Sequence, residues 1–207
     1  MSADKRFKEN YYRITHKTPK KTPEEKALAR IAEAKETGQS RLDLSELDLK
    51  TIPKEITELV WLKEIDIRWN KELKNISALS GLSQLTHLDL TGTHVSDLSA
   101  LSGLSQLTYL KLMVTQVRDL SALSGLSQLT YLDLNGTQIS DLSALSGLSQ
   151  LTELYLSHTQ VSDLSPLLPL IKKGIEIKNY DSGICDGIYI ECCPLSTPPR
   201  EVIEQGH

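Results

Sequence analysis

The residues that could do chemistry are spread along this chain and form no catalytic pattern. The histidines are His16, His87, His94, His158 and His207, and none lies at metal-ligand spacing from another histidine or a cysteine. Cys192 and Cys193 could bind a soft metal, but the sequence places no further ligands beside them. The serines recur at regular intervals outside any G-x-S-x-G elbow, and no G-x-x-x-x-G-K-S/T phosphate loop is present. We therefore expect a protein that is not an enzyme and that holds no metal or cofactor.

Composition and charge narrow the class of protein further. The 207 residues carry a formal net charge of −4, and the isoelectric point of about 5.8 argues against general nucleic-acid binding. Residues 1–21 alone carry seven basic and two acidic residues. This basic tail is either a disordered extension or an arm that binds an acidic surface or nucleic acid. We favour the first interpretation, so no nucleic-acid partner is expected.

The sequence also indicates where the protein works. No run of about 18 apolar residues is present, which predicts no transmembrane helix and no membrane partner. The first residues contain no apolar stretch of the kind that a secretory signal needs. The three cysteines, Cys185, Cys192 and Cys193, are odd in number and two are adjacent, which is a poor disulfide framework. We expect reduced thiols in a cytoplasmic protein.

A repeated unit dominates the chain and contains most of its 36 leucines. The block SALSGLSQLT begins at Ser77, Ser99, Ser121 and Ser143, always 22 residues apart, and a degenerate SPLLPL begins at Ser165. Two weaker copies precede these blocks, with the pairs Leu42/Leu44 and Ile65/Ile67 at a spacing of 23. A period of this length indicates a solenoid in which each coil stacks on its neighbours.

Each unit has the pattern of one short strand followed by a sharp return. The two leucines of an L-x-L pair have a period of two, so both point to one face of the strand. The returning segment D-L-S-A-L-S-G is too short for a full helix. The pattern L-x-x-L-x-x-L-x-L-x-x-T closely resembles the leucine-rich repeat family over about residues 40–170. We expect an α/β fold, a curved leucine-rich repeat solenoid with a parallel sheet of about seven strands on its concave face.

The chain divides into four predicted segments. Residues 1–21 are the basic tail, 22–38 an N-terminal capping helix, 39–170 the leucine-rich repeats and 171–207 a C-terminal cap. Thr22 as N-cap, Pro23 in the first turn and Glu25 at capping-box spacing indicate the helix. Leu28 and Ile31 should form its apolar stripe with the neighbouring alanines. In the C-terminal cap, residues 172–178 and 187–191 alternate like strands.

Polar residues recur at fixed places in the repeat, and we interpret them as structural. Asn70 follows one strand, whereas the later coils have Thr93, Thr115, Thr137 and Thr159 in the same place. A hydroxyl makes fewer hydrogen bonds than an amide, so we expect a thin polar ladder between coils. The residues expected to cap the returning turns are Asp97, Asp119, Asp141 and Asp163. The glycines expected to supply a positive φ where those turns end are Gly81, Gly103, Gly125 and Gly147.

The C-terminal stretch 192–206, CCPLSTPPREVIEQG, resembles the junction at which leucine-rich repeats lead into the Roc GTPase domain of Roco-family proteins. The matching residues are Pro194, Leu195, Pro198, Pro199, Glu201, Val202, Ile203, Gln205 and Gly206. The resemblance implies either the repeat domain of a longer bacterial Roco-like protein or a stand-alone relative. Because these residues contain no phosphate loop, any GTPase activity would need a domain beyond residue 207.

The strand segments differ between otherwise near-identical coils, and the differences fall on side chains that point away from the leucines. Tyr109, Tyr131 and Tyr155 lie on adjacent coils among carboxylates, and aromatic residues commonly anchor protein interfaces. The predicted partner-binding residues of the concave face are Asp66, Arg68, Trp69, His87, Asp89, Tyr109, Lys111, Met113, Tyr131, Asp133, Glu153, Tyr155 and His158. Alternatively, the differences are drift, and tyrosine simply suits strands. We expect alanine at the three tyrosines to weaken a partner while barely changing thermal stability.

The sequence therefore predicts a non-catalytic protein-protein interaction module that binds a partner of unknown identity through the concave face. The alternative is the regulatory repeat domain of a Roco-type GTPase, acting on a GTPase domain in the same chain. An enzyme would need a site on the concave face, where Asp66 and Asp89 are expected on neighbouring strands. An internalin-like surface protein would fit the 22-residue period but would need a signal peptide.

Overall fold

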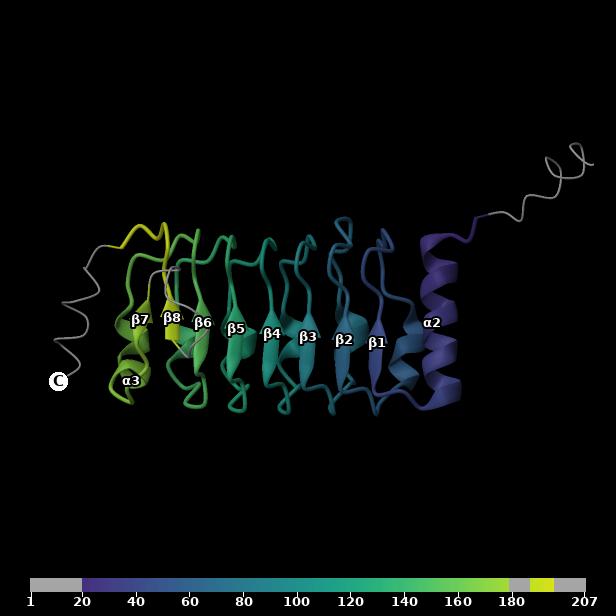
Figure 1. Cartoon of the computed structure of the whole chain (residues 1–207), viewed down its shortest axis with the longest axis horizontal. Coiled ribbons are helices and arrows are strands. Elements are labelled where there is room, and N and C mark those ends of the chain that lie inside the picture. The colour runs from purple at the N-terminus through teal and green to yellow at the C-terminus, as the bar shows by residue number, and fades with distance from the viewer. Residues whose placement is uncertain (1–19, 179–186, 196–207) are drawn as a thin grey trace, which may run out of the picture.

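The described part of the chain is a solenoid built on one parallel β-sheet (Figure 1). The computed structural model describes residues 20–178 and 187–195. The strands are β1 Arg41–Asp43, β2 Glu64–Asp66, β3 His87–Asp89, β4 Tyr109–Lys111, β5 Tyr131–Asp133, β6 Glu153–Tyr155, β7 Ile177–Lys178 and β8 Gly187–Tyr189. Their order is β1-β2-β3-β4-β5-β6-β8-β7, and each neighbouring pair is parallel. The predicted parallel sheet is confirmed, with eight strands in place of about seven.

Short helical turns return the chain from each strand to the next. The 3-10 turns are Lys54–Glu58, Ser77–Leu79, Ser99–Leu101, Ser121–Leu123, Ser143–Leu145 and Ser165–Leu167. Two α-helices lie toward opposite ends of the sheet, α2 Pro23–Thr37 beside β1 and α3 Leu168–Ile171 near β7 (Figure 1). The single turns between the strands agree with the short returning segment that the sequence predicts.

The leucine pairs of the repeat form the core. Leu88 and Leu90 of one coil and Leu110 and Leu112 of the next are fully buried. The strand register sets Leu88 beside Leu110, and Leu110 beside Leu132. Each leucine is therefore covered by the equivalent leucines of the coils on either side, and its burial is a property of the stack.

A further coil closes the C-terminal end of the sheet. β8 pairs with β6 in the register of the earlier repeats, with Tyr189 opposite Tyr155, although 34 residues separate the two tyrosines. Ile188 and Ile190 are buried as the equivalents of the leucine pair. Segment β7 lies outside β8 at the edge of the sheet. The strand-like alternation predicted for both segments is confirmed, and the step of 34 residues explains why the count of coils from the period was one short.

The side-chain amide of Asn70 joins two neighbouring coils through hydrogen bonds that it both donates and accepts. The Asn70 side chain donates to the carbonyl of Leu44 at 2.9 Å and accepts from the amide of Leu49 at 2.9 Å, both in the preceding coil. The threonines at 93, 115, 137 and 159 each donate to a carbonyl three residues back, as Thr137 does to Leu134 at 2.6 Å, and of these four only Thr159 also contacts another coil, at 3.5 Å from Cys193 Sγ. The predicted thin ladder is confirmed.

The repeated aspartates cap the returning turns, but the repeated glycines do not supply the positive φ that the sequence predicts. Asp97 Oδ1 accepts from the amide of Ser99 at 2.8 Å, and the equivalent bond occurs in the three following coils. The prediction of a positive φ at residues 81, 103, 125 and 147 is wrong. Each turn ends in a right-handed residue, such as Ser102 with φ −58° and ψ −25°. The left-handed position falls after the strand instead, where Gly92 and Gly136 have φ 68° and 67°.

Helix α2 covers the leucines at the N-terminal end of the solenoid. The Thr22 side chain accepts from the amide of Glu25 at 3.1 Å, and the Glu25 carboxylate accepts from the amide of Thr22 at 2.8 Å. These bonds form the predicted capping box. Ile31 is buried together with the alanines at 27 and 34, but Leu28 is 38% exposed, so its predicted place in the apolar stripe is wrong. The helix contacts the first coil through its small residues because they allow close approach.

We predict that Asn70→Ala destabilises the fold more than Thr137→Val does. Removing Asn70 leaves the buried amide of Leu49 without a partner, at a cost of about 1–3 kcal/mol for each group left unpaired. The carbonyl of Leu134 keeps the Thr137 amide as a donor at 3.2 Å, so the second variant should lose less than about 1 kcal/mol. Urea unfolding followed by circular dichroism measures both variants, and equal midpoints would contradict the structural role of Asn70.

Candidate binding surface on the concave face

Aromatic rings form a ladder across the concave face, the outward side of the sheet that carries the first and third residues of each strand. His87, Tyr109 and Tyr131 are the first residues of β3, β4 and β5, and the register sets them opposite one another. Their ring centroids are separated by 5.4 Å and then 4.2 Å. The ladder continues through Tyr155 and Tyr189, at centroid distances of 5.3 Å and 4.4 Å. The strand spacing of about 4.8 Å therefore sets the spacing of the rings.

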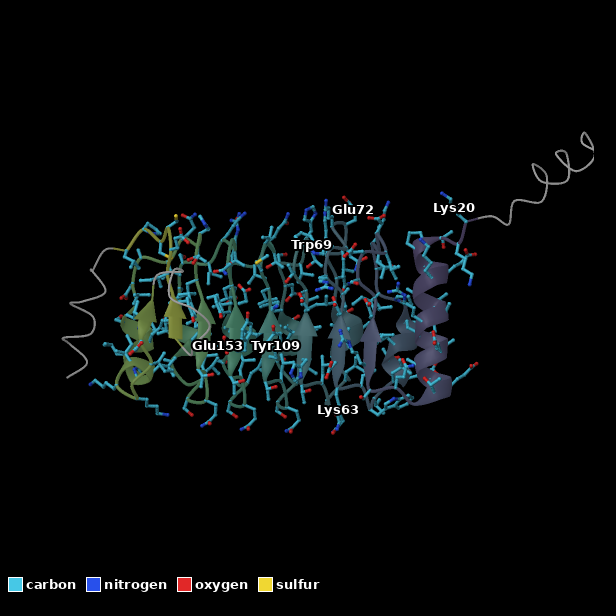
Figure 2. The ribbon with its side chains drawn as sticks, in the orientation of Figure 1. Lys20, Lys63, Trp69, Glu72, Tyr109 and Glu153 are labelled. Atoms are coloured by element: carbon cyan, nitrogen blue, oxygen red, sulfur yellow. The ribbon has the colours of Figure 1, made fainter. Side chains whose placement is uncertain are left out.

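The ladder crosses from the first to the third strand position between β5 and β6. β6 carries Glu153 first and Tyr155 third, and the planes of Tyr131 and Tyr155 are inclined by 40°. The Tyr155 hydroxyl donates to Glu153 Oε2 at 3.0 Å. Figure 2 shows Tyr109 and Glu153 at the level of the strands. Because neighbouring rings cover one another, the ladder presents ring edges and hydroxyls to a partner, together with the exposed imidazole of His87.

Lys111 supplies the positive charge at the centre of the ladder. Its Nζ lies 5.4 Å from the centroid of Tyr109 and 5.8 Å from that of Tyr131, within cation–π range. Burial alone would lower the pKa of Lys111, but Tyr109, Asp89 and Asp133 raise it above its usual value. Burial, aided by the charge of Asp133, raises the pKa of the Tyr131 hydroxyl. At neutral pH this centre therefore holds a charged ammonium and a protonated hydroxyl.

The aspartates of the third strand position are tied into the turns that follow. Asp66 and Asp89 lie opposite each other in the register, and each accepts the amide two residues further on, at 3.2 and 2.9 Å. Arg68 Nε also lies 3.4 Å from Asp66 Oδ2. Asp133 accepts the amide of Asn135 at 2.9 Å, and burial raises the pKa of Asp66 and Asp133. These carboxylates stabilise turns and do not form a free acid–base pair.

The turns beyond the strands place large residues and glycine alternately at one left-handed position. Trp69, Val114 and His158 have φ of 59°, 56° and 58°, and Gly92 and Gly136 fill the coils between them. Trp69 covers Gly92 so closely that an added Cβ there would lie 2.3 Å from a Trp69 ring carbon. Figure 2 shows Trp69 at the edge of the solenoid beyond the strands. A positive φ is uncommon for side chains other than glycine and a genuine outlier for a β-branched one such as Val114.

Two hollows lie near the ladder, one among the turns beyond the strands and one beside His87 and Tyr109. One of about 490 Å³ lies at the turn edge and is lined by Met113, Val114, Asn135, Gly136, Ser157, His158 and Glu191. The other, of about 190 Å³, is lined by Arg41, Glu64, Ile65, Asp66, Arg68, His87, Leu88, Asp89 and Tyr109. The wall of the first hollow is mainly apolar, and the second hollow is lined mainly by charged side chains.

Comparison with known proteins assigns the repeat. Residues 127–169 match a family model described as Leucine Rich repeats (2 copies). An internalin C2 from Listeria monocytogenes is similar in structure, with a TM-score of 0.58 and 25% sequence identity, over 79% of this chain and 89% of that one. The described part of this chain has the leucine-rich repeat fold.

A second solved structure is less similar to this chain. An internalin (inlF) of the same organism has a TM-score of 0.47 and 24% identity, over 58% of this chain and 42% of that one. A search of curated proteins returned no match. The matches support the repeat and not the Roco-family junction, of which only Pro194 and Leu195 lie within the described residues.

The leucine-rich repeat fold places the predicted binding residues on the strands or on the turns that follow them. It joins His87, Tyr109, Tyr131 and Tyr155 in the ladder, and it sets Met113 and His158 beside the larger hollow. The carboxylates and cations among them are Asp66, Arg68, Asp89, Lys111, Asp133 and Glu153. Trp69 lies at the turn edge over Gly92 and not in the ladder, and Asp133 is only 6% exposed.

Two residues of the surface, Tyr189 and Glu191, were missed by sequence analysis. Tyr189 ends the ladder, and Glu191 lines the larger hollow. Both follow the step of 34 residues, so the 22-residue period does not reach them. The signal that could have found them is the segment G-I-Y-I-E-C-C, which repeats the strand pattern and ends in Cys193 at the position of Asn70. The Cys193 thiol donates to the carbonyl of Leu156 in the preceding coil at 3.0 Å, as Asn70 does to Leu44.

The remaining candidates from the sequence are the metal ligands, the cysteines and the basic tail. Over residues 20–178 and 187–195, no group of three His, Cys, Asp or Glu side chains could hold a metal ion. No helix within those ranges is long and apolar enough to cross a membrane. Cys192 and Cys193 are free thiols, the first exposed and the second half-buried. Cys185 and residues 1–19 of the basic tail lie outside the described residues.

We predict that Asp133→Asn and Asp97→Asn have opposite effects on stability near pH 7. Burial raises the pKa of Asp133 in the folded state, so its charge opposes folding once the pH exceeds the unfolded pKa. A bond from the Ser99 amide lowers the pKa of Asp97, so its charge favours folding above the unfolded pKa and that contribution is lost as the pH falls. Asparagine should therefore raise the melting temperature at position 133 and lower it at position 97.

Thermal melts at pH 7 and pH 3 measure both effects. The two differences from the parent protein should shrink at pH 3, where the carboxylates approach protonation in both states. A position 133 variant that is less stable than the parent at pH 7 would contradict the role assigned to burial.

Proposed function

We propose that this chain binds a protein partner through the concave face and performs no catalysis of its own. The observation that carries the proposal is the aromatic ladder, which runs from His87 to Tyr189 across five adjacent strands of the sheet. A monomer gains stability from burying aromatic rings in its core, whereas four of these rings remain partly or fully exposed on one face. Exposed aromatic clusters rimmed by polar groups are typical of protein-binding surfaces.

The ladder is suited to a partner because it is held in place before binding. Each ring contacts its neighbours, and the Tyr155 hydroxyl is fixed by Glu153 at 3.0 Å. Side chains that are ordered in advance lose little conformational entropy when the partner docks. Tyr109, Lys111 and Tyr131 together present ring edges, a hydroxyl and an ammonium, which favours a partner with hydrogen-bond acceptors at the centre of its contact.

Stacking changes how the tyrosines should be tested. Each pair of contacting rings contributes about 0.5–1.5 kcal/mol beyond its buried area, so alanine at Tyr109, Tyr131 and Tyr155 also lowers stability. The expectation that this triple variant barely changes thermal stability is therefore replaced. A matched control needs comparable instability with an unaltered surface. Leu110→Ala provides it, because Leu110 is fully buried and its loss costs about 2–5 kcal/mol.

The predicted result is a loss of the partner with the triple tyrosine variant and its retention with Leu110→Ala. The measurement is affinity capture from the native cell, at a temperature where circular dichroism shows both variants folded. Removal of hot-spot rings should weaken binding by several kcal/mol, on the order of 2–4 kcal/mol. Equal partner recovery with the triple variant and the parent, or equal loss with Leu110→Ala, would contradict binding through the concave face.

An alternative proposal is regulation of a GTPase domain in the same polypeptide. It is favoured by the Roco-like match between Pro194 and Gly206 in the sequence. In that case the concave face would bind the GTPase domain of the same polypeptide. Sequencing of the gene beyond the codon for His207 tests it, since a G-x-x-x-x-G-K-S/T motif within the next few dozen codons supports the alternative and its absence removes it.

A cytoplasmic location remains a proposal that rests on the composition of the sequence. Reduced thiols at Cys192 and Cys193 are consistent with it. Fractionation of the native cell with antibodies against the chain tests the location directly, and recovery outside the cytoplasm would contradict it.

A further inference from the structure

Val114 is a strained and exposed side chain that packing within the chain does not explain. It has φ 56°, in the left-handed region, and it is 51% exposed. Glycine fills the same position in the coils on either side, at Gly92 and Gly136. A β-branched residue in this conformation costs stability, and residues of this kind cluster at functional sites. The position therefore displays an apolar side chain at the expense of stability.

Val114 forms a wall of the larger hollow at the turn edge of the concave face. The hollow measures about 490 Å³, and Met113 and Gly136 add further apolar surface to it. Pockets that hold a small-molecule ligand are commonly of this size and are mostly apolar.

The backbone amides around the hollow and two of its side-chain oxygens are already engaged within the protein. The amides of Val114, Gly136 and His158 donate to carbonyls of the next coil at 2.8–2.9 Å. Asn135 Oδ1 accepts from the amide of Ser157 at 2.7 Å, and Ser157 Oγ accepts from the amide of Glu191 at 3.0 Å. These groups cannot readily select a polar ligand, so the floor and the wall at Val114 favour an apolar one.

The charge beside the hollow is negative. Glu191 lines it and is exposed, and within the described residues it forms no ion pair with a basic side chain. Glu191 is the one carboxylate among the residues that line the hollow, and no lysine or arginine lines it. An occupant with a cationic group next to its apolar group would complement this charge.

We infer that the hollow between Val114 and His158 is an anchor pocket for one aliphatic or aromatic side chain of a protein partner, with a lysine or arginine of that partner beside Glu191. The inference rests on the proposed function and names the chemistry of the partner. The partner meets the concave face at two places, the ring edges of the ladder and this pocket at the turn edge. The strain at Val114 maintains the apolar wall that glycine would remove.

A peptide library tests the inference on the full chain. Phage-displayed 12-residue peptides are selected on the parent protein, and selected clones are measured against variants by biolayer interferometry. We expect enrichment of peptides with Leu, Ile, Met or Phe next to Lys or Arg. Val114→Gly should weaken these peptides by about tenfold, the change that follows loss of an ordinary interface contact. The same variant should melt at a higher temperature than the parent, because glycine relieves the strained φ.

Two further variants separate the apolar and the charged contributions. Val60→Gly is the matched control, since Val60 is 52% exposed in the turn after the segment Lys54–Glu58 and lies outside the pocket. It should leave peptide binding unchanged. A selection repeated on Glu191→Lys should retain the apolar residue and replace the basic neighbours with Asp or Glu.

The outcomes distinguish this inference from the proposed function. Clones without the apolar–basic pair, no selected clones, or equal binding to the parent and Val114→Gly would overturn the anchor pocket. Clones that bind Val114→Gly normally but fail on the triple tyrosine variant would overturn the pocket and leave concave-face binding supported. Clones that bind both variants like the parent would count against both.

Discussion

Burial of leucine side chains between neighbouring coils holds this solenoid together. A single coil cannot form a core, because it cannot cover its own leucines. Leu110 is fully buried only because Leu88 and Leu132 lie in register on either side. The hydrogen bonds follow from the same stacking, since Asn70 and Cys193 reach carbonyls of the preceding coil. A stack of this kind needs covered ends, and α2 and the β8–β7 pair provide them. The concave face follows from the same arrangement. Because the leucines point into the core, the alternate residues of each strand must point outward.

The regular part of the fold could be read from the sequence, and the irregular part could not. The 22-residue period determines the strand register and the aspartate caps, because both depend on contacts that recur in every coil. The period does not predict the pairing of β8 with β6, because an insertion separates Tyr189 from Tyr155 by more than one repeat length. The glycines show a second limit. The 3-10 turns end in right-handed serines, and the glycines that follow at 81, 103, 125 and 147 have no positive φ. These dihedral angles depend on the type of turn, which the residue pattern did not specify.

The candidate surface was partly predictable for the same reason. Tyr109 and Tyr131 share a strand position, so their adjacency followed from the period. The crossing of the ladder to Tyr155 did not, because it requires two different strand positions to come within ring contact. The burial of Asp133 and the close cover of Gly92 by Trp69 also depend on the sizes of side chains in neighbouring coils. Sequence pattern thus identified which residues face outward, and packing decided which of them remain available to a partner.

The near identity of the returning turns has a consequence for the length of the molecule. The residues that begin the turns in three successive coils, Leu98, Leu120 and Leu142, have φ of −101°, −104° and −106°. One 22-residue unit can therefore replace another at the backbone level, and duplication of a unit would lengthen the sheet by one strand spacing, about 4.8 Å. Deletion of the unit that carries Tyr131 would instead set Tyr109 beside Glu153 and divide the ring series. In genetic terms, unequal recombination between these repeats changes the reach of the surface and its side-chain order in a single event, while both ends stay intact.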